Sequence, residues 1–451
     1  MKKSINSLCL ALFIIVFSIT NIFAQKEWTL EECIKYALDN NIQIKRQELQ
    51  KEVVKNNYIQ SKMQILPSLN ASGYHSLNNG QVLNQAQYKW ESATTEYGQY
   101  GLNSNLTLFS GLTNYYNIQA NKFNLLKNLQ DVEKAKNDLI LNIATAYLQV
   151  LYNMELLDVA KGQLEVTQLE VEKRQKLLEV GNIAKGTLLE IQAQAASEQV
   201  SLTNSENQLT LTYLTLSQLL ELDSATNFRI VKPVELSVDS LVIPNSVLEV
   251  FSEAETKLPE IKSAEFQLSM AEQQYNADKG RRYPILSLYA SYSSWYSAKV
   301  NGLFNPVAGS SYGIQLFDQN LQKSIGLNIN IPIFNNYSIQ NKISNSKINV
   351  LDSKYSYELS KKVLYKEIQQ AQADAIAAYE NYKSNKQSVI ANEESFKYVQ
   401  QKYDVGLVNA VDYNTAKNIL AKAKSDLLQA KYDFIFKTKI LDFYKGNPIK
   451  L

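Results

Sequence analysis

The 451-residue chain is short of cysteine and histidine, and each shortage excludes a class of chemistry. Its two cysteines are Cys9 and Cys33, and its one histidine is His75. A catalytic triad with a histidine base could be built only around His75, and the sequence has no run of histidines and cysteines with metal-ligand spacing. We therefore predict that the protein is not an enzyme and uses neither a cofactor nor a metal.

Long apolar runs are also missing, except at the N-terminus. There Lys2 and Lys3 precede an apolar run at 8–19, and Ala24 supplies a small residue before Gln25. This pattern predicts a secretory signal peptide at 1–24. Cys9 lies too early in it, and without a small residue before it, so we expect no lipid attachment.

Charge of one sign is absent from the exported chain. Without residues 1–24 the chain loses two of its 46 basic side chains. The remaining 44 basic side chains equal the 44 acidic ones in number. A balanced surface argues against nucleic-acid binding, which needs a basic face. Only Cys33 then remains, so no intrachain disulfide can form. Because no later segment has 18 consecutive apolar residues, we expect no membrane-spanning helix.

Proline and glycine are nearly absent from two long spans. Residues 68–232 and 333–447 contain no proline, and within them residues 112–222 have only three glycines and residues 337–445 only Gly406. Because these two residues break helices most strongly, the spans can hold very long helices. Apolar residues step by three or four along them, opposite polar faces, so each helix needs a partner helix. We predict long helices at 112–180 and 340–405, and shorter ones at 187–222 and 412–446.

Alternation of apolar with small polar residues marks a second kind of segment. It is clearest at 324–334 and 100–109, and weaker at 285–296 and 66–77. A period of two is typical of strands. We predict strand pairs within 66–109 and 284–334, joined by long polar loops at 78–99 and 298–321.

The chain is an internal repeat, in which each half reads helix, two strands, very long helix, glycine turn and helix. Ile44 aligns with Ile261 and Pro67 with Pro284 at one offset, and Gly181 aligns with Gly406 at a slightly larger one. The organisation we predict is a first repeat at 25–222, a linker at 223–256, a second repeat at 257–446 and a tail at 447–451.

Helix lengths and strand number suggest how such chains assemble. The expected helices at 33–64 and 187–222 together match the length of the long helix at 112–180, which at about 1.5 Å per residue spans roughly 100 Å. Two short helices beside one long helix make a hollow rod. The strands suit a barrel wall with one face toward lipid and one toward a lumen, and such a wall must close. Four strands cannot close around a lumen but three chains supply twelve, so we predict a homotrimer.

Four stretches carry a resemblance to a known family. They are "WTLEECIKYALDNNIQIK" at 28–45, "LFSG" at 108–111, "INIPIFNN" at 329–336, and the paired turns that contain Gly181 and Gly406. In this order, within a duplicated unit, the chain resembles the TolC-like outer-membrane factors, or outer-membrane efflux proteins.

The resemblance implies an α+β fold in which each protomer gives four transmembrane strands and long periplasmic helical hairpins. Three protomers would form a 12-stranded barrel continued by a helical tunnel. The implied function is an outer-membrane exit duct for efflux or type I secretion, reaching into the periplasm and in contact with outer-membrane lipid. It implies two further partners, a periplasmic adaptor and an inner-membrane transporter, with passive conduction through the duct.

The resemblance also assigns roles at the two turns. Val405, Gly406 and Leu407 match the tip that contacts the adaptor, whereas Val180, Gly181 and Asn182 match it only in the first two residues. A helix end with a left-handed glycine accounts for the same glycines, and both interpretations can hold.

The family's entrance uses an acidic ring and an arginine clasp. By position, Asp412 matches one ring aspartate and Thr415 the second ring position, while Val408 stands at the clasp arginine and Thr187 at its acidic partner. The chain therefore lacks the family's clasp. As an alternative, Asp412 and Thr187 are expected to be helix N-caps, the latter in a capping box with Glu190.

One alternative function remains open from the sequence, a non-conducting periplasmic coiled-coil structural protein. It gives no reason for the alternating strands.

Overall fold

The computed structural model describes residues 27–84, 88–223, 228–232, 238, 241, 243–244, 246–300 and 311–450. The expected signal peptide at 1–24 lies outside these residues, as do Leu451 and parts of the expected linker and loops. The chain divides into two compact units. Unit 1 comprises the described residues of Met1–Gln47, Val132–Leu258 and Lys361–Leu451, and unit 2 those of Glu48–Asp131 and Pro259–Ser360. Each unit takes segments from both sequence repeats.

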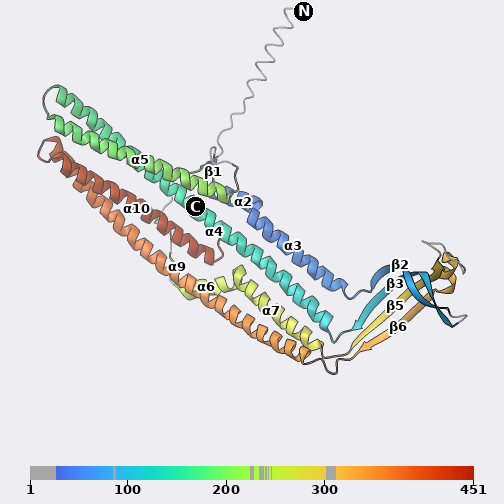
Figure 1. Cartoon of the computed structure of the whole chain (residues 1–451). Helices are drawn as coiled ribbons and strands as arrows, with labels where there is room; N and C mark the ends of the chain where they lie inside the picture. The colour runs from blue at the N-terminus through green and yellow to red at the C-terminus, as the bar shows by residue number, and fades with distance from the viewer. Residues whose placement is uncertain are drawn as a thin grey trace, which may run out of the picture. The chain divides into compact units, whose positions relative to one another are not determined.

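Unit 2 contains a four-stranded antiparallel sheet with the strand order β2-β3-β5-β6 (Figure 1). The strands are β2 (Ser68–Asn84), β3 (Lys89–Phe109), β5 (Ile285–Val300) and β6 (Gln322–Asn330). With long helices elsewhere, the described residues have the α+β fold predicted from the sequence.

The expected loop at 78–99 is wrong in its described part. Residues 78–84 and 89–99 continue β2 and β3, and their backbones pair from Asn78 with Thr95 to Asn84 with Lys89. Here both faces of the hairpin carry polar residues as well as apolar ones. A strand of that kind gives no period-two hydrophobic signal. Residues 85–87, and 301–310 of the second expected loop, lie outside the described residues. The prediction of a loop is also wrong at 298–300, which belong to β5, and at 312–319, which form the short helices α8 (Tyr312–Ile314) and η2 (Gln315–Gln319).

The strand register separates two kinds of side chain onto the two faces of the sheet. Directly paired residues of antiparallel strands share a face. Leu286 pairs with Ile329 and Leu288 with Leu327, whereas Ser287 pairs with Asn328 and Asn103 with Ser291. Over these residues one face is therefore aliphatic and the other bears small polar groups, whereas farther along β3 and β2 the first face also carries Ser104, Glu96 and His75. Ile329 is 63% exposed in the single chain, so nothing in the described residues covers its aliphatic side chain.

The four longest helices begin and end within a few residues of their predicted bounds. They are α4 (Thr113–Glu179), α5 (Lys185–Leu219), α9 (Ser338–Asp404) and α10 (Ala410–Tyr444). In unit 2, α4 begins where Gly111 passes the backbone of Gly280, the last residue of α7 (Pro259–Gly280). A Cβ on Gly111 would lie 2.1 Å from the Gly280 carbonyl oxygen, so the approach requires glycine.

The single helix expected at 33–64 is wrong, because Asn41 divides it into α2 (Leu30–Asn40) and α3 (Ile42–Met63). The Asn41 side-chain oxygen accepts hydrogen bonds from the backbone N–H groups of Gln43 (2.9 Å) and Ile44 (3.2 Å), as an N-cap does. The Asn40–Asn41 pair in the sequence was the available signal for this break.

The first described residues of the chain, from Glu27 onward, belong to the core of unit 1. Strand β1 (Glu27–Trp28) pairs in parallel with β4 (Arg229–Ile230), and β4 lies inside the expected linker. The Tyr147 hydroxyl of α4 lies 2.9 Å from the Val231 carbonyl and 3.2 Å from that of Trp28. Thr29 and Glu32 form a capping box at the start of α2. Helix α6 (Val247–Lys257) follows in this unit. Every helix of the described residues is too short or too polar to span a bilayer.

Candidate functional site

Two glycine turns lie at one end of unit 1, at the upper left of Figure 1, where α4 turns into α5 and α9 into α10. Gly181 has φ +76° and Gly406 has φ +78°. The N–H groups of Gly181 and Asn182 bond to the carbonyls of Leu178 and Leu177, both at 2.9 Å. This Schellman arrangement, repeated after α9, ends a helix on a left-handed glycine. The glycines are therefore required by the turn itself, as the sequence indicated.

The residues beside these glycines are aliphatic and exposed. Leu407 is 75% exposed, and Val405, Val411 and Val180 are also largely in solvent. In a Schellman turn the residue after the glycine often packs back on its own helix, but Leu407 does not. Its exposure is thus not explained by helix termination.

The expected N-caps are wrong. The residue that caps α10 is Asn409, whose side-chain oxygen accepts the Asp412 backbone N–H at 2.8 Å. Asp412 is the third residue of the helix, and its side chain is exposed. In the first repeat the cap position is Ala184, and Thr187 lies inside α5 with its N–H on the Ala184 carbonyl. The helices begin two residues earlier than the sequence pattern suggested, so neither side chain stands at a cap.

Val408, the position of the family's clasp arginine, packs in an apolar cluster. The cluster is formed by Tyr403, Ala410 and Tyr413, with Phe396, Val399 and Val408 around them. The rings of Tyr403 and Tyr413 stack at 4.4 Å. Burial raises the pKa of Tyr413 to about 12. Asp412 and Thr415 lie on the exposed side of α10, opposite the buried Ala410 and Tyr413.

Close to the turns, α4 is joined to α9 by two cationic side chains. Lys173 donates to an Asp404 carboxylate oxygen at 3.1 Å, and this hydrogen bond raises the pKa of Lys173. The neighbouring Arg174 places its guanidinium 4.4 Å from the centre of the Tyr403 ring, a cation–π contact. The two helical hairpins of unit 1 are thus joined at their turns by residues that sequence reasoning did not single out.

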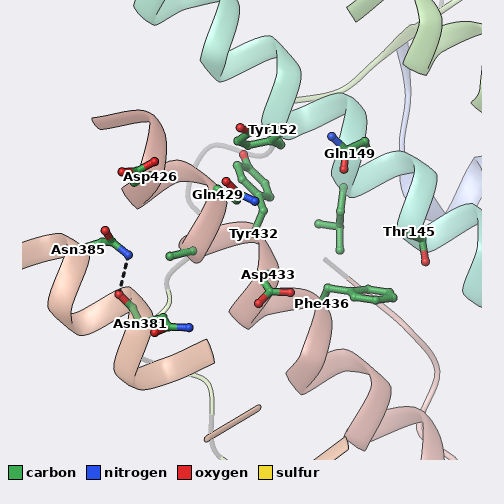
Figure 2. Close-up of a pocket in the computed structure, with 12 residues that line it drawn as sticks. Thr145, Gln149, Tyr152, Asn381, Asn385, Asp426, Gln429, Tyr432, Asp433 and Phe436 are labelled. Carbon is green, nitrogen blue, oxygen red and sulfur yellow. Dashed lines mark hydrogen bonds between the residues drawn. The ribbon is translucent and has the colours of Figure 1, made fainter. Parts of the chain in front are cut away.

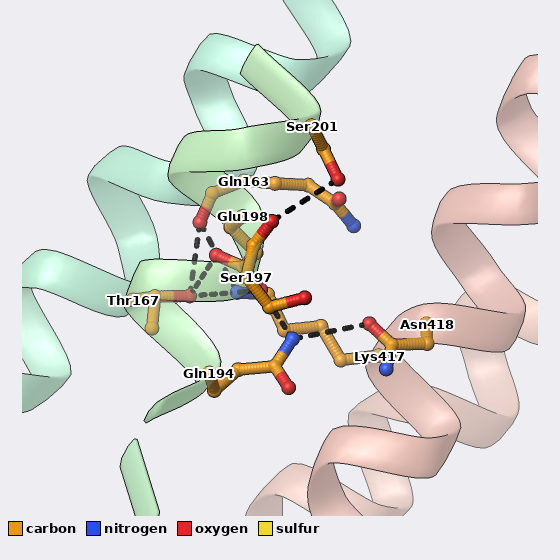
Figure 3. Close-up of polar contacts among 8 residues, drawn as sticks. All are labelled: Gln163, Thr167, Gln194, Ser197, Glu198, Ser201, Lys417 and Asn418. Atoms are coloured by element: carbon orange, nitrogen blue, oxygen red, sulfur yellow. Dashed lines mark hydrogen bonds and ion pairs between the residues drawn. The ribbon is translucent and has the colours of Figure 1, made fainter. Parts of the chain in front are cut away.

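A second connection between the hairpins lies deeper in unit 1 and is buried. Figure 3 shows Lys417 of α10 reaching to Thr167 of α4 and Glu198 of α5. On the exposed side of this contact, the Gln194 amide donates to Asn418 at 3.3 Å. Lys417 could have been noticed in the sequence, because Ala410, Tyr413 and Lys417 follow helical spacing and the lysine interrupts an apolar series.

A cleft of about 550 Å³ lies between α4, α9 and α10, also in unit 1 (Figure 2). Its labelled lining is mostly amide, hydroxyl and carboxylate groups, including Asn381, Asn385, Asp426 and Asp433. The Asn385 amide bonds back to the Asn381 carbonyl at 2.9 Å. Leu148, Ala430 and Phe436 add apolar surface, so the lining is mixed.

One family model matches the chain twice. The model of the outer membrane efflux protein family matches residues 33–221 and again residues 250–437, one match in each repeat and together well over half of the chain. The chain belongs to the outer membrane efflux protein family.

Relatives of this outer membrane efflux protein are similar over most of their length. The outer membrane protein TolC of Escherichia coli (strain K12) is 24% identical over 358 residues, which are 74% of this chain and 68% of TolC. The probable efflux pump outer membrane protein TtgC of Pseudomonas putida is 21% identical over 88% of this chain and 79% of its own. Among solved structures, the Campylobacter jejuni CmeC outer membrane channel matches with a TM-score of 0.78 at 17% identity, covering 93% of this chain and 86% of CmeC. A CusC structure also gives 0.78, at 19% identity over 95% of this chain and 96% of its own. The chain thus has the TolC-like fold.

The predicted site residues fall into separate groups within this outer membrane efflux protein. Val180, Gly181 and Asn182 form one turn, and Val405, Gly406 and Leu407 the other. Thr187, Val408, Asp412 and Thr415 follow these turns, yet in the described part of the chain no hydrogen bond or ion pair joins Thr187 to the other three. Contacts that do join the hairpins include those of Lys173, Arg174 and Lys417, and the hydrogen bond that the Tyr432 hydroxyl of α10 donates to Glu155 of α4 at 2.8 Å.

Proposed function

We propose that this protein is an outer-membrane exit duct that passively conducts substrate from the periplasm to the exterior, in efflux or type I secretion. It would receive substrate from an inner-membrane transporter through a periplasmic adaptor, and it would be anchored without lipid attachment. The observation that carries this proposal is the sheet with one aliphatic and one small polar face, in a chain of the outer membrane efflux protein family.

The two faces suit the two solvents of a barrel wall. Ile325, Leu327 and Ile329 share the aliphatic face with Leu286 and Leu288, where lipid tails would cover them. Asn328 and Ser287 on the other face suit a lumen filled with water. The proposal gives the exposed aliphatic side chains a covering that the single chain lacks.

Closure of the barrel supports a homotrimer. The sheet of one chain ends in two edge strands, β2 and β6, and unpaired backbone groups are not tolerated in lipid. Edge-to-edge joining of three sheets gives twelve strands, enough for a lumen wider than side chains alone would fill.

The turns are the proposed docking points for the adaptor. The exposed Val405 and Leu407 beside Gly406 offer an aliphatic tip, and Val180 beside Gly181 a smaller one. Asn182 replaces the aliphatic residue at the corresponding place, so the α9/α10 turn is the stronger candidate of the two.

The proposed entrance includes Asp412, with Thr415 next to it on the exposed side of α10. Three copies of Asp412 around a threefold axis would form a carboxylate ring that attracts cations. Thr187 and Val408 occupy the family's clasp positions without its charges. Lys173 with Asp404, and Arg174 with Tyr403, join the hairpins near the turns in this chain.

Planar-bilayer recording of the purified protein tests the proposal. We expect discrete conductance steps, together with recovery of the protein in the outer-membrane fraction as a heat-modifiable oligomer. A protein that gives no steps and fractionates with the soluble periplasm would instead be the non-conducting coiled-coil alternative. That alternative leaves the aliphatic face of the sheet uncovered.

A further inference from the structure

The ammonium group of Lys417 is buried and fully hydrogen-bonded. The residue is 6% exposed, on the side of α10 that faces α4 and α5. Its three N–H donors meet three acceptors: the Gln163 carbonyl at 3.1 Å, the Thr167 hydroxyl, and Glu198 Oε1 at 2.9 Å. Because a lysine has three donors and no acceptor, no donor is left over.

The partner carboxylate is equally well placed. Glu198 is also 6% exposed, and its second oxygen lies 2.5 Å from the Thr167 hydroxyl, while Oε1 also accepts the Gln194 amide at 2.8 Å. Figure 3 shows these groups converging from α4, α5 and α10 on one point. A buried ion pair stays charged only when such additional hydrogen bonds support it.

Stability alone does not explain this cluster. Apolar residues of similar volume at the three positions would hold three helices together at least as well, because they avoid the cost of removing two charges from water. The charges instead fix the position of the three helices relative to one another. A buried polar residue in a helical interface fixes the register of the helices, because every other register leaves it without partners.

The geometry makes that register specific. One helical turn is about 5.4 Å, so sliding α10 by one turn would carry the Lys417 ammonium beyond all three acceptors and leave two buried charges unpaired. By contrast, Lys173 and Asp404 near the turns are about half exposed, and water can replace their hydrogen bond. The buried cluster therefore discriminates between registers where the exposed contacts do not.

We infer that Lys417, Glu198 and Thr167 form a register pin that fixes the α9/α10 hairpin against the α4/α5 hairpin and so keeps the Gly406 turn level with the Gly181 turn. Lys417 is a positioning residue in this arrangement. The register follows from contacts within unit 1; its consequence, a closed entrance that opens only when the pin separates, rests on the proposed function.

Spin-label distance measurement tests the pin directly. Labels are attached at Asn182 and Leu407, one beside each turn, in the full-length protein mixed with an excess of unlabelled protein. Cys33 is fully buried, so an aqueous label does not reach it. We expect one narrow distance distribution in the otherwise unchanged protein. The triple variant Lys417→Met, Glu198→Leu, Thr167→Val should keep or raise Tm, yet at least double the width of the distribution or give a second peak.

The matched control is Lys424→Met, which removes an ion pair with Glu393 that lies within the α9/α10 hairpin and is about half exposed. It should leave the distribution unchanged. Should the triple variant fail to fold, Thr167→Val alone removes one acceptor and should broaden the distribution less. A narrow distribution at the original distance in either pin variant overturns the inference.

In planar-bilayer recordings the triple variant should open several-fold more often than the unaltered protein. If the distance distribution broadens but the protein conducts no ions, the register pin is supported and the proposed function as an exit duct is contradicted.

Discussion

At the scale of single residues, the helix N-cap and the exposed charge after the Gly406 turn belong to two residues, Asn409 and Asp412. The sequence pattern had offered Asp412 for both. Asp and Asn are both good N-caps, and both stand just after the Gly406 turn, so pattern alone could not decide between them. The hydrogen bond from the Asp412 N–H to Asn409 decides it. Asp412 is left as an exposed carboxylate in the first turn of α10.

We expect Asp412→Asn to weaken cation preference in planar-bilayer recordings and to reduce block by multivalent cations. Its loss of the favourable interaction with the helix N-terminus should cost no more than about 0.5 kcal/mol of unfolding free energy. The matched variant Asn409→Ala should do the opposite. It should lower stability by about 1 kcal/mol while selectivity stays the same. If both variants have the same selectivity as the unaltered protein, the gate lies elsewhere.

Tyr413 gives a prediction about alkaline pH. Its pKa in the folded protein, about 12, is higher than the usual value of about 10. A raised folded pKa means that its contribution to stability is complete below pH 10 and is lost as the pH rises to about 12. Tyr413→Phe cannot ionise. In urea unfolding at pH 8 to 12, the variant should therefore lose about 2 kcal/mol less than the unaltered protein. Parallel losses in the two proteins would show that Tyr413 contributes nothing to the decline.

At the scale of elements, helices were easier to predict than strands for a physical reason. Proline and glycine are so unfavourable in helices that the lack of proline, with Gly162 as the one glycine, between Thr113 and Glu179 nearly fixed α4 before any contact was known. Strand β3 has no such marker. Its residues 89–99 pair by backbone hydrogen bonds that do not depend on an apolar pattern, and only the part near Leu106 alternated clearly.

The sheet predicts different outcomes for neighbouring substitutions in β6. Ile329→Arg places a charge on the aliphatic face and should cost about 2–4 kcal/mol near the bilayer midplane. Asn328→Arg, one residue away on the face of Ser287, should assemble normally. Folding into lipid vesicles across a urea series measures both. Equal tolerance of arginine at the two positions would contradict the assignment of the faces.

At the scale of the whole molecule, we expect three protomers in each particle. Light scattering of detergent-extracted protein should give three times the mass of the mature chain, without a stable monomer. A well-folded monomer in detergent would remove the closure argument for twelve strands.

The site was less predictable than the fold, because its contacts join distant parts of the chain. The turns follow from Gly181 and Gly406, which the sequence alone identifies. The meeting of Arg174 with Tyr403, or of Lys417 with Glu198, depends on how α4, α5, α9 and α10 pack, and no local pattern encodes it. Resemblance to the family led instead to Val408 and Thr187, where this chain carries no charge.

The unequal edges of the sheet have a consequence for the joints between protomers. Strand β2 has 17 residues, but β6 has only 9. In the proposed trimer, β6 of one protomer meets β2 of the next, and the shorter strand limits the ladder between them. The outer part of each β2 then continues past the end of β6, and the backbone N–H groups along that edge of β2 have no partner strand. At each boundary between protomers, backbone hydrogen bonding would be complete near the helices and incomplete at the outer rim of the barrel. Hydrogen exchange should be fast at alternate amides of residues 77–84, and the barrel should begin to separate there.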